Sequence, residues 1–146
     1  MQKNIYEIFT EVKLLNPKVA RVLSLSDFYY YDDLSGVEID STDPDQLFLL
    51  DELQRIFSDL DSVSQRLTYL SQPIKTEGKL LKQSNGRYAV NGVELTSGCS
   101  VEYLSDHAGY EPHQTRWKSS RIEHNGSDYY IVGGSFSLNG ITVRIR

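Results

Sequence analysis

Apolar residues recur along the middle of the chain with the spacing of a long amphipathic helix. From residue 49 to residue 70 they follow one another at alternating intervals of four and three, the heptad pattern of a helix that packs along one stripe. This stripe consists of Leu49, Leu53, Ile56, Leu60, Val63, Leu67 and Leu70. Asp43 is a suitable N-cap, Pro44 suits the first turn and Pro73 ends the segment. The pattern predicts a helix over residues 44–72.

Two shorter amphipathic segments precede this helix. Ile5, Ile8 and Val12 lie on one face of a helix that we predict over residues 3–15. The Asn16-Pro17 pair interrupts the pattern. Asn16 can cap a second helix, over residues 17–25, because Pro17 suits its first turn.

After residue 73 the apolar residues alternate with polar ones. Four Asn-Gly pairs, which favour tight hairpin turns because both residues tolerate positive φ, lie beyond residue 84. The predicted strands are residues 76–82, 86–90, 93–95, 100–104, 117–124, 128–132 and 141–146. We therefore predict an α+β fold in which the helices pack on a small, mostly antiparallel β-barrel or meander of five to seven strands. We expect the helical region (1–72) and the β region (73–146) to form one integrated unit, since three helices alone bury little core.

Charge is distributed unevenly between the two regions. Residues 1–72 carry 13 acids and 6 bases, and residues 73–146 carry 7 acids and 9 bases, which together account for the net charge of −5. Between residues 27 and 61 the only base is Arg55. Such a field repels nucleic acid and favours a basic partner, such as the nucleic-acid-binding groove of another protein. The alternative is a solvated acidic face that serves solubility.

Four adjacent aromatic residues followed by carboxylates stand out in the segment before the long helix. Tyr side chains beside acids are typical of protein interfaces, because Tyr buries a large area at low entropy cost. The predicted partner-binding residues are Tyr29, Tyr30, Tyr31, Asp32, Asp33, Glu38, Asp40 and Asp43. Alternatively, the aromatic residues fill the junction between the two regions.

The β region interleaves basic and aromatic residues, a combination with which small barrels bind single-stranded nucleic acid. The residues of this alternative site are Arg87, Tyr88, Arg116, Trp117, Lys118, Arg121 and Tyr129. With a period of two, Trp117, Arg121 and Glu123 share the face opposite Ile122, where a guanidinium group can stack on the indole. Arg121 and Glu123 equally suit a salt bridge that fixes strand register. The net charge of +2 is weak for a dedicated nucleic-acid-binding domain.

The residues contain no recognisable catalytic or cofactor-binding motif. His107 and His113 lie six residues apart, but a structural zinc site normally needs four well-spaced Cys or His ligands and Cys99 is the only thiol, so we expect no metal and no cofactor. Cys99 is the single cysteine, which favours a reducing, cytoplasmic setting. The chain has no apolar run long enough for a membrane span, and its first residues do not resemble a signal peptide.

A series of short motifs in the β region occurs in a characteristic order. Asn85-Gly-Arg-Tyr88 and Glu94-Leu-Thr-Ser-Gly98 lead to Trp117, followed by Arg121-Ile-Glu-His-Asn-Gly126, Tyr129-Tyr130 and Val143-Arg-Ile-Arg146. Over about residues 76–146 this order resembles an uncharacterised domain-of-unknown-function family of Gram-positive bacteria, their conjugative elements and phages. The resemblance implies an accessory gene on mobile DNA. It carries over no catalytic residues.

Taken together, these features lead us to expect a non-enzymatic accessory protein of a mobile element. We expect its acidic helical face to bind a nucleic-acid-handling host protein, as a DNA mimic that inhibits a defence nuclease in the style of an anti-CRISPR or anti-restriction protein. The alternative is direct nucleic-acid binding by the β region. The 49–70 heptad also allows self-association.

Overall fold

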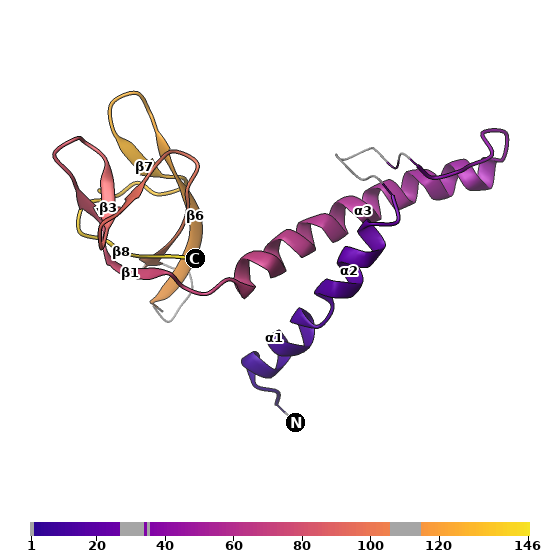
Figure 1. Ribbon diagram of the computed structural model, residues 1–146, viewed down its shortest axis with the longest axis horizontal. Helices are drawn as coiled ribbons and strands as arrows, with labels where there is room; N and C mark the ends of the chain where they lie inside the picture. The colour runs from indigo at the N-terminus through magenta and orange to yellow at the C-terminus, as the bar shows by residue number, and fades with distance from the viewer. Residues whose placement is uncertain (1, 27–33, 35, 106–114) are drawn as a thin grey trace. The chain divides into compact units, whose positions relative to one another are not determined.

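The computed structural model describes residues 2–26, 34, 36–105 and 115–146. The chain divides into two compact units, residues 1–72 and residues 73–146, which we call the helical unit and the β unit. The helical unit contains α1 (Ile5–Lys13), α2 (Asn16–Leu23) and α3 (Pro44–Ser71) (Figure 1). The architecture is therefore α+β, with helices close to the predicted ranges.

Local hydrogen bonds set the helix boundaries. Asn4 caps α1 in a capping box, in which its side chain accepts from the helix and the Glu7 side chain accepts from the Asn4 backbone. The predicted cap at Asp43 is confirmed, because its side chain accepts from Asp45 N at 2.9 Å and Pro44 occupies the first turn. α3 ends at Ser71, just before Pro73.

The predicted cap at Asn16 is wrong. Asn16 is the first residue of α2, and no side chain caps this helix. Its amide instead links α2 to α3, accepting from Ser64 Oγ at 3.1 Å and donating to Thr68 Oγ1 at 3.4 Å. A cap was plausible from local sequence alone, but these two hydroxyl groups offered Asn16 partners some fifty residues away.

The helical unit buries few apolar side chains. Among its described residues only Leu34, Phe57 and Leu67 are buried hydrophobic side chains. Within the heptad stripe, Leu49, Ile56 and Val63 are 44–55% exposed. None of the helices that the structure describes is long and apolar enough to cross a membrane.

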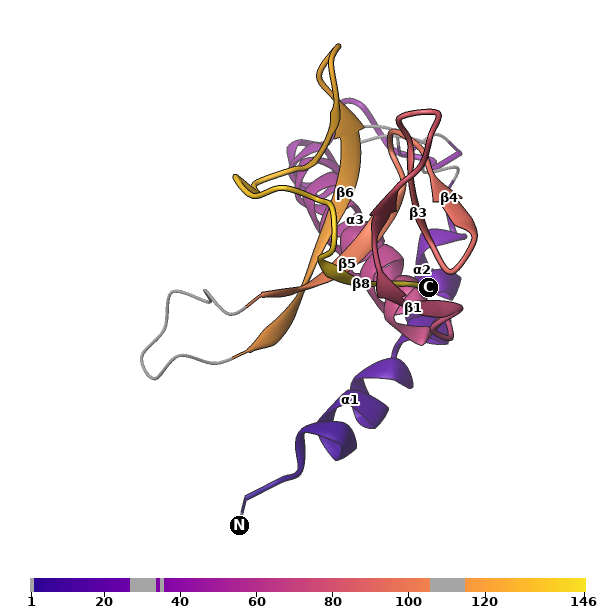
Figure 2. The same ribbon diagram turned by 90° about the vertical axis from the view of Figure 1, so that its left-hand side faces the viewer.

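The β unit contains two antiparallel sheets. The five-stranded sheet has the order β1-β8-β5-β6-β7, and the three-stranded sheet has the order β2-β3-β4. The strands are β1 (Thr76–Lys79), β2 (Leu81–Lys82), β3 (Tyr88–Val90), β4 (Val93–Leu95), β5 (Ser100–Ser105), β6 (Arg116–His124), β7 (Tyr129–Ile131) and β8 (Thr142–Ile145). Figure 2 shows β3 and β4 on one side of β1 and β8, with β5 and β6 on the other.

Of the two predicted arrangements, a small barrel or a meander, the described part of the β unit does not form a closed barrel, because β1 and β7 remain the edges of an open sheet. The predicted strand 76–82 divides at Leu80, whose side chain is fully buried. Leu80 still bonds through its backbone to the segment before β8, donating to Ile141 O at 2.9 Å and accepting from Gly140 N at 2.7 Å. Beyond Leu80 the chain leaves the larger sheet and pairs with β3 instead.

The core of the β unit draws side chains from both sheets. It consists of Leu80, Tyr88, Val90, Leu95, Val101, Tyr103, Ile122, Ile131, Leu138 and Val143. Tight turns hold the short strands in register. At Asn91-Gly92 both residues have positive φ, +46° and +79°, which confirms the predicted hairpin between β3 and β4.

Candidate functional site

The acidic residues before α3 are ordered by hydrogen bonds of their own segment. Asp40 accepts from Thr42 Oγ1 at 2.6 Å and from Thr42 N at 2.8 Å. These two bonds, the side-chain bond first, lower the pKa of Asp40 below its ordinary value of 3.8, so it is charged at neutral pH. The Gln46 side chain spans the segment, donating to Asp43 Oδ2 at 3.0 Å and accepting from Asp40 N at 2.8 Å. The carboxylates therefore have defined positions.

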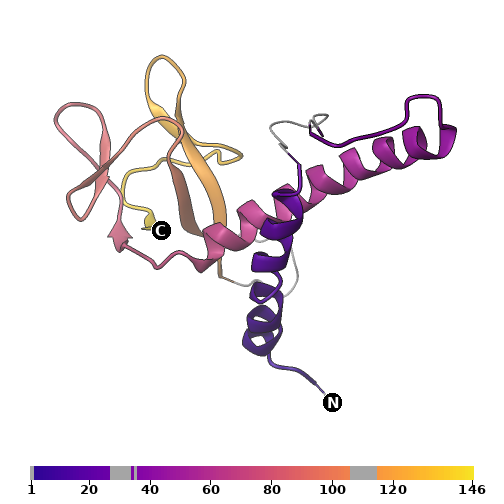
Figure 3. The same ribbon diagram turned by 45° about the vertical axis from the view of Figure 1, so that its right-hand side comes forward.

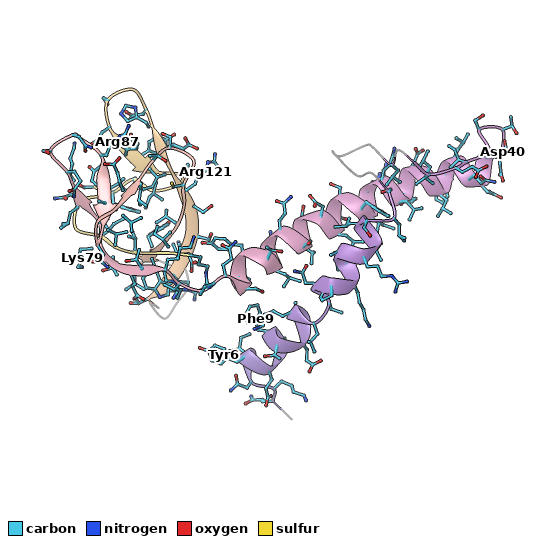
Figure 4. All side chains as sticks on the ribbon, viewed as in Figure 1. Tyr6, Phe9, Asp40, Lys79, Arg87 and Arg121 are labelled. Atoms are coloured by element: carbon cyan, nitrogen blue, oxygen red, sulfur yellow. The ribbon has the colours of Figure 1, made fainter. Side chains whose placement is uncertain are left out.

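These carboxylates also face solvent. Glu38 and Asp40 are exposed and Asp43 is half-buried, and Figure 4 shows Asp40 at the end of the helical unit where α3 begins. None of the three forms an ion pair with a described residue. The segment presents ordered negative charge that basic side chains of the described chain do not neutralise.

The same holds along most of the helical unit. Within the described part of this unit the only ion pair joins Glu52 to Arg55 at 3.7 Å. The remaining described carboxylates lie on or beside the helices: Glu7, Glu11, Glu38, Asp40, Asp43, Asp45, Asp51, Asp59 and Asp61. The predicted residues Tyr29, Tyr30, Tyr31, Asp32 and Asp33 lie outside the described residues, and their role stays a prediction.

The β unit shows the opposite arrangement, because four of its five described acids pair with its bases. Arg87 bonds Glu94 at 2.6 Å, which raises the pKa of Arg87 and lowers that of Glu94. Lys82 bonds Asp128 at 3.1 Å. These bridges lie on different strands and turns.

The outward face of β6 differs in detail from the predicted binding strip. Ile122 is fully buried, so Trp117, Arg121 and Glu123 do share the opposite face, as the alternation predicts. Arg121 Nε donates to Glu123 Oε1 at 2.9 Å within the same strand. The guanidinium that stacks on the indole belongs to Arg144 of β8, 4.3 Å from the ring centre. Stacking by Arg121 is therefore wrong, because Arg144 reaches the ring from β8, across the intervening strand β5.

A buried carboxylate lies beside this stack, and sequence reasoning missed it. Glu102 is 5% exposed. Its Oε1 accepts from Arg144 Nε at 2.9 Å and Nη2 at 2.7 Å, and its Oε2 accepts from Arg146 Nε at 2.6 Å. We call these three residues the Glu102 cluster. The sequence contains a weak signal for this cluster. Glu102 lies between the apolar residues Val101 and Tyr103, and Arg144 and Arg146 lie on either side of Ile145, so the charged residues occupy alternate positions of their strands.

The other predicted nucleic-acid-binding residues do not converge on one surface. Tyr88 is only 4% exposed, so its ring is not available for stacking. Tyr129 is half-buried, edge-on to Tyr88 with ring centres 6.3 Å apart. Figure 4 shows Arg87 and Arg121 on separate elements of the β unit.

Arg116 and Lys118 alternate with Trp117 and so belong to the inward face of β6. Lys118 lines a surface pocket of about 450 Å³ together with Tyr103 and Phe136, whose rings lie 5.3 Å apart. The pocket and the Trp117 face therefore lie on opposite sides of the strand. The seven residues of the alternative site therefore lie in three separate places: Trp117 and Arg121 on the outward face of β6, Arg116 and Lys118 on its inward face, and Arg87, Tyr88 and Tyr129 on or beside other strands.

Comparison with known proteins gives the β unit a family match without a function. No curated protein and no solved structure matches the chain. Residues 78–145 match the family described as Domain of unknown function (DUF5348). This range agrees with the resemblance inferred over about residues 76–146, and it covers most of the β unit.

Proposed function

We propose that this protein is a non-enzymatic binding protein whose acidic helical unit engages a basic, nucleic-acid-handling protein. The supporting observation is the contrast in charge pairing between the two units. Described acids of the helical unit have a single basic partner, whereas Glu94, Glu102, Glu123 and Asp128 of the β unit are each paired. Unpaired surface carboxylates create a long-range negative potential that attracts a basic surface.

The ordering of Asp40 and Asp43 supports recognition rather than solubility alone. Their oxygens are held by Thr42, Asp45 and Gln46, so binding a partner costs little further side-chain entropy at this end of the unit. Two fixed, negatively charged carboxylates can take the place of phosphate groups in a basic groove. The sharper form of the proposal is therefore a DNA mimic that blocks a host defence nuclease on behalf of a mobile element.

Neutralisation tests the proposal better than charge reversal does, because Asp40 and Asp43 also hold the turn and the helix cap. Asn keeps the acceptor oxygen that these roles require. The test variant combines Glu38→Gln, Asp40→Asn and Asp43→Asn. The control variant removes the same charge elsewhere on the helical unit, through Glu11→Gln, Asp51→Asn and Asp61→Asn.

The measurement is capture of proteins from a Gram-positive lysate on each immobilised variant. We expect the wild type and the control to retain a protein that the test variant loses. The retained protein should bind duplex DNA on its own, and the wild-type chain should compete with that DNA. Equal retention by the test variant, or a retained protein with no affinity for DNA, would contradict the proposal.

Direct nucleic-acid binding by the β unit is the alternative, and a mobility-shift experiment separates the two. Direct binding predicts that the purified chain retards single-stranded or duplex DNA, with an affinity that falls steeply with salt. The mimic predicts no retardation. The DNA-mimic proposal is favoured, because Arg87, Arg121 and Arg144 of the β unit are paired with carboxylates and its aromatic residues do not share one surface.

A further inference from the structure

The helical unit contains an apolar groove between α1 and the C-terminal half of α3. The groove has a volume of about 340 Å³. Its lining includes Ile8, Phe9 and Val12 of α1 and Val63, Arg66 and Leu67 of α3. Figure 3 shows α2 beside α3 and α1 diverging from α3, while the N-terminal turns of α3 extend past α2. Arg66 is the only charged residue of the lining, and it has no ion pair with a described residue.

The protruding N-terminal turns of α3 carry exposed apolar side chains and carboxylates, which complement the apolar groove and its arginine. Phe48 is 66% exposed and Leu49 is 55% exposed, although both are large apolar side chains on the first turns of a helix. Carboxylates surround them, at Asp45, Asp51 and Glu52. One end of α3 is thus an apolar protrusion ringed by acids, and the other end forms an apolar groove with one arginine.

We infer that the helical unit forms an antiparallel two-fold dimer, in which the N-terminal turns of α3 of each copy fill the groove of the other. A protrusion and a groove on the same surface are self-complementary under a two-fold axis. The stripe also links them, because Leu49, Ile56 and Val63 recur every seven residues along one side of α3. A second copy buries all three.

The charges agree with one register. With the two-fold axis beside Asp59, residues equally distant from it lie opposite each other, so Glu52 of each copy meets Arg66 of the other. Leu49 then faces the space between Leu67 and Leu70, as a knob faces a hole. In a parallel pair Glu52 would lie level with its own counterpart, and Arg66 with its own.

The exposed area suits a stable interface. Burying one large apolar side chain removes on the order of 100 Å² from water. The exposed apolar residues on the groove and on the adjoining side of α3 are on average about half exposed, which amounts to roughly 350 Å² per copy. These residues are Ile5, Ile8, Val12, Phe48, Leu49, Ile56 and Val63. The low end of the standard interface range is about 600 Å² per partner, of which somewhat more than half is non-polar.

Charge exchange within the full-length chain tests this dimer by sedimentation equilibrium. Arg66→Glu and Glu52→Arg should each raise the dimer Kd about ten-fold, because each replaces two attractive pairs by repulsive ones. The double variant Arg66→Glu/Glu52→Arg should restore the wild-type Kd. The matched control is Arg21→Glu on α2, which should leave the Kd unchanged.

A second variant strengthens the dimer and so cannot be explained by unfolding. Asp59 meets its own copy at the axis, and Asp59→Asn should lower the Kd several-fold by removing this repulsion. A monomer at all concentrations would overturn the inference. A dimer whose Kd ignores these substitutions, or single variants that the double variant fails to rescue, would overturn it equally. Because Glu38, Asp40 and Asp43 play no part here, this test is independent of the proposed function.

Discussion

The buried carboxylate of Glu102 gives the sharpest test of how the β unit is held together. Glu102→Gln keeps the size of the side chain and removes the negative charge between two guanidinium groups. Side-chain exposure is 6% for Glu102, 19% for Arg144 and 14% for Arg146. The substitution therefore removes the counter-charge that Glu102 supplies to two largely buried guanidinium groups.

The expected loss of stability follows from the burial of the cluster. Removing one partner from a buried ion pair typically costs about 3–5 kcal/mol. Both arginines retain some solvent contact, so we reduce the expected loss in the free energy of unfolding to about 2–4 kcal/mol. In a unit of this size that loss lowers Tm by roughly 10–30 °C.

Trp117 makes the measurement specific to the β unit. It is the only tryptophan of the chain and stacks on Arg144 of the cluster. Its fluorescence during urea unfolding gives the free energy of unfolding of this unit for each variant. Glu123→Gln is the matched control, because Glu123 pairs with the exposed Arg121 and its loss should cost at most about 1 kcal/mol. Equal stability of the two variants would refute the anchoring role of the Glu102 cluster.

Two further substitutions test the turns of the β unit. Gly92 has φ +79° and open space around it, so Gly92→Ala should cost about 1–2 kcal/mol through backbone strain alone. Urea unfolding beside Ser97→Ala checks this, and an unchanged midpoint would contradict it. The Tyr129 backbone N–H and then Lys82 lower the pKa of Asp128 below its ordinary 3.8. Its contribution is complete above that pH and is lost as the pH falls through the lowered pKa. Asp128→Asn should therefore flatten the acid limb of stability, and equal acid sensitivity would argue against the bridge.

Helix and turn positions were predictable because their causes are local. The cap at Asp43, the heptad of α3 and the Asn91-Gly92 hairpin each depend on residues within one or two turns of the chain. Strand ranges followed from alternation, and seven predicted segments correspond to eight strands, with one divided at Leu80. That division was not predictable, because the bonds of Leu80 to Gly140 and Ile141 depend on a segment sixty residues away.

The alternation of apolar and polar residues along the strands did not show which side chains would contact each other. A period of two placed Trp117, Arg121 and Glu123 on one face, and this is correct. It could not show that Arg144 would reach the indole, or that Glu102 would be buried beneath two arginines. Those contacts depend on β8 pairing with β5 across more than forty residues.

The segregation of charge, net −7 in the helical region and net +2 in the β region, follows from composition alone and was therefore predictable. Which of these charges are neutralised depends on the folded arrangement of the chain. Antiparallel strands bring acids and bases of the β unit into pairs, whereas acids along α3 project from a helix that offers them few bases within reach. The negative charge of Glu102 is thus neutralised by two arginines, whereas that of Asp40 faces solvent and can attract a partner.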